Sequence, residues 1–309
     1  MNQPAKRKRV PVHGVLLLDK PEGMSSTQAL AKVKWLLNAE KAGHTGTLDP
    51  FATGLLPLCF GEATKFAQDL LEADKTYEAT VQLGVTTTTG DTEGEVIDTK
   101  PVQVSREQVI AVLEQFRGPI RQVPPMHSAL KRDGRPLYEY ARQGITLERE
   151  AREVTILALD LLELLPTQLK LRVACSKGTY VRVLGEDIGA ALGCGAHLTA
   201  LRRVVIDTLE LSRAVTLDAL SAMSEAERAS RLLPVDALLS KFPRVELDSE
   251  LASRFRQGQR IALGREGVPA PCADGRVSVY DGLLLLGTGT LTHGALLAPD
   301  RLMANKPSH

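Results

Sequence analysis

The stretch that decides the fold reads Gly43-His44-Thr45-Gly46-Thr47-Leu48-Asp49-Pro50-Phe51-Ala52-Thr53-Gly54-Leu55-Leu56-Pro57. Asp49 precedes a proline, and proline disfavours the α region for its predecessor, so an extended or turn conformation is predicted there. The glycines at 43, 46 and 54 allow the backbone to approach a ligand closely. Such a loop can hold a carboxylate toward a pocket. Asp-Pro is also common turn chemistry, and on spacing alone a structural role is the better interpretation.

Five further blocks change that interpretation. They are Lys75-Thr76-Tyr77, Pro124-Pro125-Met126-His127-Ser128-Ala129-Leu130-Lys131, Leu137-Tyr138-Glu139, Ser176-Lys177-Gly178-Thr179-Tyr180-Val181-Arg182 and Leu201-Arg202-Arg203. With the first stretch they resemble, in the same order, the blocks of the TruB family of tRNA pseudouridine synthases. The resemblance covers roughly residues 14–211. Each block alone is only moderately specific, whereas chance does not produce all of them in order.

The composition of the chain limits the class of protein to which it can belong. The chain has 309 residues, of which 43% are hydrophobic and 24% charged, which suits one large domain and a small one. No run reaches the roughly 18 apolar residues that a membrane helix needs, so no membrane association is expected. Cys59, Cys175, Cys194 and Cys272 are far apart, which argues against a zinc site or disulfide scaffold and favours a reducing cytoplasm.

Net charge is only +1, yet the charges are unevenly distributed. Residues 1–50 hold 8 Lys and Arg against 4 Asp and Glu, whereas residues 51–116 hold 4 against 11. Residues 117–152 hold 8 against 4, and residues 170–203 hold 6 against 2. If the three basic segments converge, they form a surface for RNA that the total conceals. From charge alone, ordinary solvated faces are the simpler interpretation.

The pattern of residues predicts an α+β fold. Residues 14–19, 77–83, 154–165, 169–175 and 201–211 read as strands, and the third and fourth of these as a pair. Capping boxes at Ser25 and Ser105 open helices, and residues 62–71 and 179–191 also read as helical. Residues 43–54 and 117–136 are expected to be irregular.

The resemblance adds domain limits and a fold name. We expect a basic N-terminal arm at 1–12 and a catalytic domain of the pseudouridine-synthase fold, with a central mixed or antiparallel sheet, at 13–243. A small β-rich PUA-like RNA-binding domain is expected at 244–303, followed by a tail at 304–309. The match in the C-terminal part is looser, and a purely structural β-rich appendage is the alternative there.

The resemblance also implies an activity, the conversion of uridine to pseudouridine at position 55 in the T-loop of tRNA. The target base is flipped out, its N-glycosidic bond is cleaved, and C5 is joined to C1′ with Asp49 as nucleophile. The reaction involves no redox change, so neither a cofactor nor a metal is expected. The spacing of the glycines fits neither a P-loop nor a dinucleotide loop.

Two further catalytic residues follow from the same resemblance. Arg182 is expected to pair with Asp49 and keep it ionised, because a nearby opposite charge favours the charged carboxylate. Tyr77 is expected to stack on the flipped uracil and to remove the C5 proton. Taken alone, Arg182 also suits a contact with the RNA backbone, and Tyr77 suits a core position on its strand.

The remaining positions are expected to bind substrate. Tyr180 and Leu201 would line the uridine pocket, and His44 would contact RNA near the flipped nucleotide. Lys20 corresponds to a lysine that lies near the site in the family. Phosphate contacts are expected from three further basic residues, Lys131, Arg202 and Arg203. Taken alone, Leu201 would be a core residue.

The expected partner is the T-stem-loop of tRNA, bound by a monomer that needs no protein partner. Two alternatives remain open. The chain could bind and fold RNA without chemistry, or it could be a synthase that works with a guide RNA inside a multiprotein complex. The length of the chain and its C-terminal segment favour the stand-alone enzyme.

Overall fold

The structure is a computed structural model that describes residues 8–292 and 295–304. Most of the expected arm and tail therefore lies outside the described residues. At the described end of the arm, the Arg9 Nη1 donates to the Lys34 carbonyl oxygen at 3.2 Å. Within the described residues, no helix is long and apolar enough to cross a membrane.

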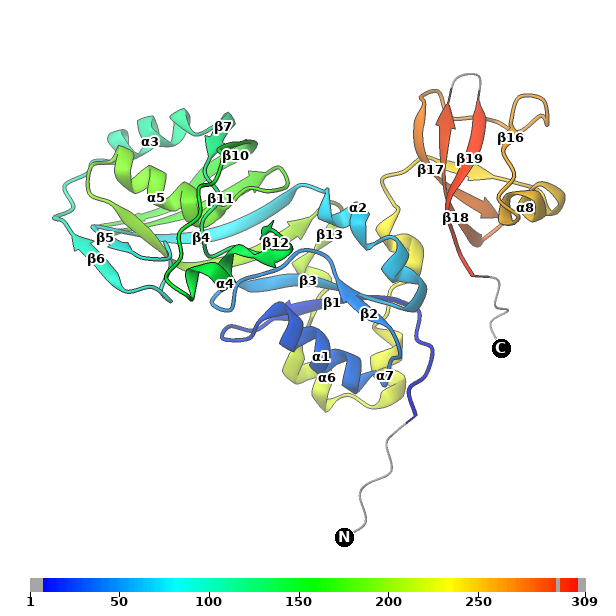
Figure 1. Ribbon diagram of the computed structural model, residues 1–309, viewed down its shortest axis with the longest axis horizontal. Coiled ribbons are helices and arrows are strands. Elements are labelled where there is room, and N and C mark those ends of the chain that lie inside the picture. The colour runs from blue at the N-terminus through cyan, green and yellow to red at the C-terminus, as the bar shows by residue number, and fades with distance from the viewer. Residues whose placement is uncertain (1–7, 293–294, 305–309) are drawn as a thin grey trace, which may run out of the picture.

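A ten-stranded sheet forms the large N-terminal part (Figure 1). Its main path is β14-β1-β3-β12-β4-β11-β10-β7, with β13 beside β12 and β2 beside β3. The pairs β1/β14 and β3/β12 are parallel and the other pairs are antiparallel, so the sheet is mixed as expected. The strands are β1 (Gly14–Lys20), β2 (Ala42–His44), β3 (Thr53–Phe60), β4 (Lys75–Leu83), β7 (Gly118–Gln122), β10 (Arg152–Leu165), β11 (Gln168–Cys175), β12 (Ala196–Ile206), β13 (Leu209–Glu210) and β14 (Val215–Thr216). Two small hairpins stand outside it, β5 (Val85–Thr87) with β6 (Val96–Thr99), and β8 (Lys131–Arg132) with β9 (Arg135–Pro136).

Both faces of the central strands are covered. Leu16 and Leu18 of β1 pack into the main core, whereas Val15 and Leu17 pack into a second core on the other face. Successive side chains of a strand point to opposite faces. A strand buried on both faces reads as a continuous apolar run without alternation.

The longer helices pack into the main core on one face of the sheet, whereas a short helix at residues 67–71 and the 3-10 turns at residues 61–65 and 235–238 pack into the second core on the other face. In Figure 1, α3 and α5 lie together over one end of the sheet, and α1, α6 and α7 lie near β1. The predicted capping boxes at Ser25 and Ser105 are confirmed, because each serine accepts a hydrogen bond from the backbone of the glutamine three residues on. The helices of this part are α1 (Ser26–Leu36), α2 (Ala67–Leu71), α3 (Arg106–Gln115), α4 (Leu137–Ala141), α5 (Val181–Ala191), α6 (Leu217–Ala222) and α7 (Glu225–Ser230), with 3-10 turns η1 (Gly61–Lys65), η2 (Leu211–Arg213) and η3 (Val235–Leu238).

Two expectations about elements were wrong, and one strand was not predicted. Residues 53–60 form the central strand β3, which pairs with β1 along its whole length. The helix expected at 62–71 is a 3-10 turn followed by the five-residue α2. Residues 118–122, expected to be irregular, form β7 at the edge of the sheet. For β3 and β7, pairing with a neighbouring strand outweighs a weak local preference.

A five-stranded sheet forms the C-terminal part, in the order β15-β17-β18-β19-β16. Its elements are β15 (Arg244–Glu246), α8 (Ser249–Arg256), β16 (Ile261–Ala262), β17 (Gly275–Asp281), β18 (Leu284–Thr292) and β19 (Leu296–Leu302). It has its own core around Phe255 and Val279. Tyr280 and Leu285 pack instead into the second core of the larger part and join the two domains.

Candidate active site

One pocket of about 370 Å³ contains most of the expected residues. The Asp49 loop, the beginning of β4, the turn before α5 and the middle of β12 all contribute side chains to it. Asp49, Tyr77, Tyr180, Arg182 and Leu201 line it together. A larger hollow of about 820 Å³ lies where residues 11–13 meet the C-terminal domain, and none of these five residues lines it.

The Asp49 loop is held by hydrogen bonds on both sides of the aspartate. The Leu48 N–H donates to the Ser26 hydroxyl at 2.8 Å, and that hydroxyl donates to the Leu48 carbonyl at 3.0 Å. On the other side, the Gly23 N–H donates to the Pro50 carbonyl at 2.8 Å. The first turn of α1 and the turn after β1 therefore fix Asp49 in place.

The glycines of the loop were expected to let the backbone approach a ligand closely, and the structure gives Gly54 a different role. At Gly54 φ is +99°, and a Cβ there would lie 2.3 Å from the Arg203 carbonyl oxygen. Its close neighbour is thus the backbone of β12. At Gly43 φ is not in the left-handed region, and a Cβ would meet nothing within 4 Å.

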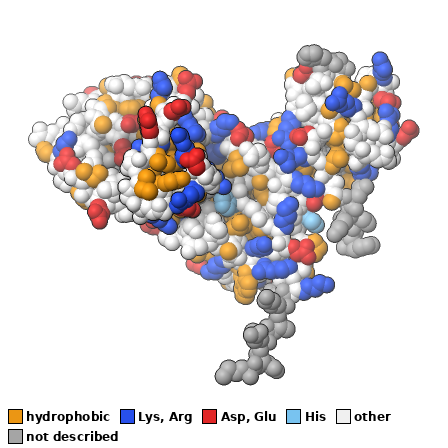
Figure 2. Space-filling model, viewed as in Figure 1, with side chains coloured by type: hydrophobic (Ala, Val, Ile, Leu, Met, Phe, Trp, Pro, Cys, Tyr) orange, Lys and Arg blue, Asp and Glu red, His pale blue; other side chains and the backbone are white. Residues whose placement is uncertain are grey.

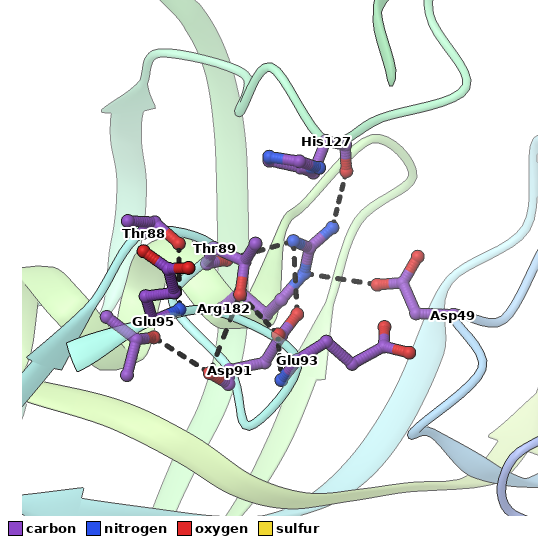
Figure 3. Close-up of polar contacts among 9 residues, drawn as sticks. Asp49, Thr88, Thr89, Asp91, Glu93, Glu95, His127 and Arg182 are labelled. Carbon is purple, nitrogen blue, oxygen red and sulfur yellow. Dashed lines mark hydrogen bonds and ion pairs between the residues drawn. The ribbon is translucent and has the colours of Figure 1, made fainter. Parts of the chain in front are cut away.

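Arg182 is the centre of the polar network, shown in Figure 3. Its Nε lies 3.1 Å from Asp49 Oδ2, and its Nη1 lies 3.3 Å from Asp91 Oδ2. The guanidinium also donates to the backbone carbonyls of Thr89 at 3.0 Å and His127 at 2.6 Å. Four acceptors on three segments of the chain thus fix the plane of a buried guanidinium.

The expected ion pair between Asp49 and Arg182 is present, but the direction of the pKa shift was not expected. Burial raises the pKa of Asp49, and this outweighs the opposing pull of Arg182. The buried Asp91 adds a further rise because it is a like charge nearby. The Asp49 side chain remains 37% exposed, so it is open to the pocket.

Tyr77 and Tyr180 reach the pocket from different elements. Tyr77 lies on β4 and is partly buried against the main core. Tyr180 immediately precedes α5, where the Gln122 side chain accepts from its N–H at 3.1 Å and donates to its carbonyl at 3.3 Å. Burial raises the pKa of both phenols. Both are therefore neutral phenols at neutral pH.

Three basic residues that were expected to lie near the substrate or contact it are buried or point away from the pocket. Lys20 is fully enclosed, and its Nζ donates to the carbonyls of Pro21, Met24 and Pro50. Burial lowers its pKa to about 8. Arg203 is also enclosed, at 1% exposure, which prevents contact with phosphate in this structure. Arg202 points to the opposite face of β12, where it pairs with Asp19 at 2.7 Å.

The last two expected residues flank the pocket. Lys131 is exposed on the β8–β9 hairpin, directly after the pocket-lining residues 128–130. His44 lies on β2 and does not line the pocket. Burial, with Arg203 nearby, lowers the His44 pKa, and its Nδ1 is buried without a partner among the described residues. Its contact with RNA stays a prediction, as does that of Arg202.

Asp91 is a member of the network that the sequence did not predict. Asp91 is 2% exposed and follows the β5 strand, where the Glu93 N–H donates to its Oδ1 at 2.9 Å. Nothing near it in sequence marks it as a partner of Arg182, because 91 residues separate the two. The surplus of acidic residues in 51–116 is the only signal, and it does not single out one residue.

Comparison with known proteins gives a consistent result. Residues 34–181 match the TruB family pseudouridylate synthase N-terminal domain, residues 182–240 the tRNA pseudouridylate synthase B C-terminal domain, and residues 243–303 the C-terminal domain of pseudouridine synthase II TruB. The chain is 62% identical over 303 residues to tRNA pseudouridine synthase B of Burkholderia lata, covering 97% of this chain and 94% of the relative. It is 59% identical to the protein of that name from Ralstonia nicotianae, covering 98% of both.

Solved structures show the same fold. The structure resembles a chain of the Cbf5–Nop10–Gar1 complex with a TM-score of 0.72 at 27% identity, over 94% of this chain and 84% of the other. A chain of an H/ACA ribonucleoprotein bound to a substrate RNA containing 2′-deoxyuridine matches equally, with a TM-score of 0.72, 26% identity and the same coverage.

The fold and the carboxylate pocket define an RNA pseudouridine synthase, which is an isomerase. Within that class the identity to curated relatives is decisive. The chain belongs to the TruB family of tRNA pseudouridine synthases.

Proposed function

We propose that the protein isomerises uridine to pseudouridine at position 55 in the T-loop of tRNA, with Asp49 as the nucleophile. The observation that carries this proposal is the position of Asp49. It is fixed on both sides by backbone hydrogen bonds, it is paired with Arg182 at 3.1 Å, and it is still 37% exposed to the pocket. A carboxylate held this way can approach a bound nucleoside without rearranging.

The pocket suits a single flipped nucleotide. Its volume of about 370 Å³ lies at the lower end of the range for small-ligand sites. Flipping a base costs a few kcal/mol, and one aromatic stack returns roughly 1–3 kcal/mol. Tyr77 therefore offsets much of the cost of flipping, and the remaining contacts with RNA supply the rest.

The reaction needs groups for three steps. Asp49 attacks the target nucleoside, the N1–C1′ bond breaks, and the freed uracil turns so that C5 bonds to C1′. The bond between Asp49 and the nucleoside then breaks and returns the free carboxylate. The C5 proton then leaves while its bonding electrons restore the ring double bond, and N1 gains a proton. Tyr77 lines the same pocket as Asp49 and is the candidate acceptor for the C5 proton. The net proton balance of the isomerisation is zero.

RNA binding is proposed to use the face that Figure 2 shows, where Lys and Arg side chains gather between the two domains. T-loops are recognised by shape and splayed bases, which suits a pocket flanked by the exposed Lys131. We assign the C-terminal domain, residues 244–303, a PUA-like role in holding the same RNA. The protein is proposed to act as a monomer in the cytoplasm.

The test uses tRNA with tritium at uridine C5. The unaltered protein is expected to release tritium to water, and Asp49→Asn is expected to bind the tRNA with similar affinity and release none. Asp98→Asn is the matched control, because Asp98 is an exposed carboxylate on β6. Equal release by Asp49→Asn and the unaltered protein would remove Asp49 from the proposed role.

A second candidate function rests on the solved structures, because one matching chain comes from a complex with Nop10 and Gar1. In that case the protein would need a guide RNA and partner proteins. The identity of 62% to relatives named tRNA pseudouridine synthase B favours the stand-alone enzyme. Modification of a bare T-stem-loop by the purified protein alone decides between them, and failure of that reaction supports the second candidate.

A further inference from the structure

Arg203 is a buried cation that the proposed chemistry does not use. It is among the largest side chains with less than 2% exposure, and a guanidinium stays protonated in proteins. Among the described residues no carboxylate forms an ion pair with it, and Tyr77 is the only side chain that acts on its pKa. A buried charge without a counter-ion is costly, so a compensating role is expected.

Its hydrogen bonds join the two ends of the Asp49 loop. The Arg203 Nε donates to the Leu55 carbonyl at 2.8 Å, and its Nη2 donates to the Gly46 carbonyl at 3.2 Å. Gly46 lies three residues before Asp49, and Leu55 lies six residues after it. The planar guanidinium therefore links the residues that precede Asp49 to those that follow it.

The backbone of Arg203 places its side chain beside Tyr77. In the antiparallel pair of β12 and β4, Arg203 lies directly opposite Tyr77, so their side chains share one face of the sheet. The register shifts between Arg203 and Val205, and such a bulge re-aims a side chain. The close approach of Gly54 to the Arg203 backbone fixes the strand from its other side.

We propose that Arg203 is a positioning residue that holds the Tyr77 phenol at the pocket and, through its fixed positive charge, stabilises the phenolate form during turnover. Both side chains line the pocket that contains Asp49. The proposal rests on the proposed function, because it needs Tyr77 to exchange a proton with the substrate.

The electrostatics agree with this geometry. Burial raises the pKa of Tyr77, and the largest opposing effect is the positive charge of Arg203, helped by a hydrogen bond from its side chain. The phenolate is the form that can accept the C5 proton, and its negative charge is balanced by the guanidinium. Without Arg203, burial and the nearby Cys175 and Asp49 would all raise the pKa of the phenol, and the anion would be harder to form.

The experiment removes the positive charge of Arg203 and then makes the Tyr77 phenol more acidic. Arg203→Gln removes the cation but keeps a side chain that can donate hydrogen bonds. We expect it to fold, to bind a T-stem-loop as tightly as the unaltered protein, and to release C5 tritium roughly tenfold or more slowly in a single turnover. Replacing Tyr77 by 3-fluorotyrosine, a more acidic phenol, is expected to recover part of that rate in the Arg203→Gln protein. Arg172→Gln is the matched control, since Arg172 lies on the neighbouring β11 and pairs with Glu78 away from the pocket.

The outcomes separate the possibilities. Unchanged turnover in Arg203→Gln, or a loss that 3-fluorotyrosine does not reduce, overturns the proposal. If Arg203→Gln does not fold, Arg203→Lys carries the test, because lysine keeps the charge and loses the fork. For that variant the single-turnover rate is measured as a function of pH. A rate that does not change with pH in the alkaline range overturns the proposal. An alkaline pH dependence whose midpoint differs from that of the unaltered protein supports it. Failure of the proposed function itself is distinguished by the absence of tritium release from the unaltered protein.

Discussion

The two oppositely charged residues of the central ion pair, Asp49 and Arg182, differ in their exposure to the pocket. Asp49 is open to the pocket and carries a raised pKa, whereas Arg182 is buried and is held by two carboxylates and two backbone carbonyls. The buried guanidinium of Arg182 holds the Asp49 carboxylate in a fixed orientation at the pocket. The arrangement keeps the reactive group accessible and its support immobile.

The raised pKa of Asp49 predicts the acid side of the pH–rate profile. The proposed role of Asp49 as nucleophile requires the ionised carboxylate, so the single-turnover rate should fall on acidification with an apparent pKa above 3.8, the ordinary value for an aspartate. Between 3.8 and the raised pKa, the folded state binds more protons than the unfolded state at this residue. Protonation of Asp49 therefore adds stability as the pH falls, and this residue does not contribute to acid unfolding.

Measuring tritium release and T-stem-loop binding together across the acid range checks this prediction. Binding that stays constant while the rate falls assigns the effect to chemistry. A rate whose acid limb lies at or below pH 3.8 would contradict the raised pKa.

At the scale of elements, the conformation of the Asp49 loop depends on how β3 and β12 approach each other. The loop leads directly into β3, whose first residues pair in parallel with Arg202 and Arg203. Gly54 makes that approach possible because a side chain there would collide with the β12 backbone. Sheet pairing thus determines where the loop ends and where Asp49 points.

Substitution of Gly54 tests this dependence. Gly54→Ala is expected to lower the free energy of unfolding by about 1–3 kcal/mol, from its positive φ and from the backbone contact at 2.3 Å. It should also slow the chemical step by displacing Asp49. Gly43→Ala in the same loop is the control, with open space around it and an ordinary φ. Urea unfolding of both variants measures the difference, and equal losses would show that the strand contact is unimportant.

Much of the element pattern was predictable, for reasons that the structure makes visible. The alternation in β4 and β11 and the capping boxes before α1 and α3 are local signals, and all four were confirmed. The strand β3 escaped prediction because both its faces are buried, so that it reads as an apolar run after a glycine-rich loop. The shortness of α2 could not be foreseen, since residues 61–65 tighten into a 3-10 turn at the domain junction.

Across the whole molecule, the C-terminal domain is joined to the catalytic domain through both polar and apolar contacts. Arg276 on β17 lies 2.5 Å from Asp69 on α2 and 3.1 Å from Asp300 on β19. Lys65 Nζ donates to the Leu302 carbonyl at 2.8 Å. Figure 1 shows the C-terminal sheet beside this end of the large N-terminal part, so these contacts set the orientation of one domain relative to the other.

Removing Arg276 should loosen that junction. Asp69 is 6% exposed, and burial already raises its pKa against the pull of Arg276. Arg276→Met leaves this carboxylate without its main partner and is expected to cost about 3 kcal/mol of stability. Arg254→Met is the control, because Arg254 pairs with Glu266 at the surface of the same domain, where such pairs contribute about 0–1 kcal/mol.

Urea unfolding and limited proteolysis of residues 239–243 measure the effect. Faster cleavage and a lower unfolding midpoint are expected for the Arg276 variant alone. Similar behaviour of the two variants would show that apolar contacts by Tyr280 and Leu285 hold the domains without the ion pairs.

The sequence by itself determined the family, the α+β class and the pocket residues Asp49, Tyr77, Tyr180, Arg182 and Leu201, because these are encoded in short ordered blocks. Only the tertiary structure decided which charges meet. Asp91 joins Arg182 across 91 residues, and Arg203 turns inward to Tyr77 while its neighbour Arg202 turns outward to Asp19. Strand pairing and burial govern these contacts, and both depend on segments far apart in the chain. The raised pKa of Asp49 has the same origin, since desolvation depends on every element that surrounds the carboxylate.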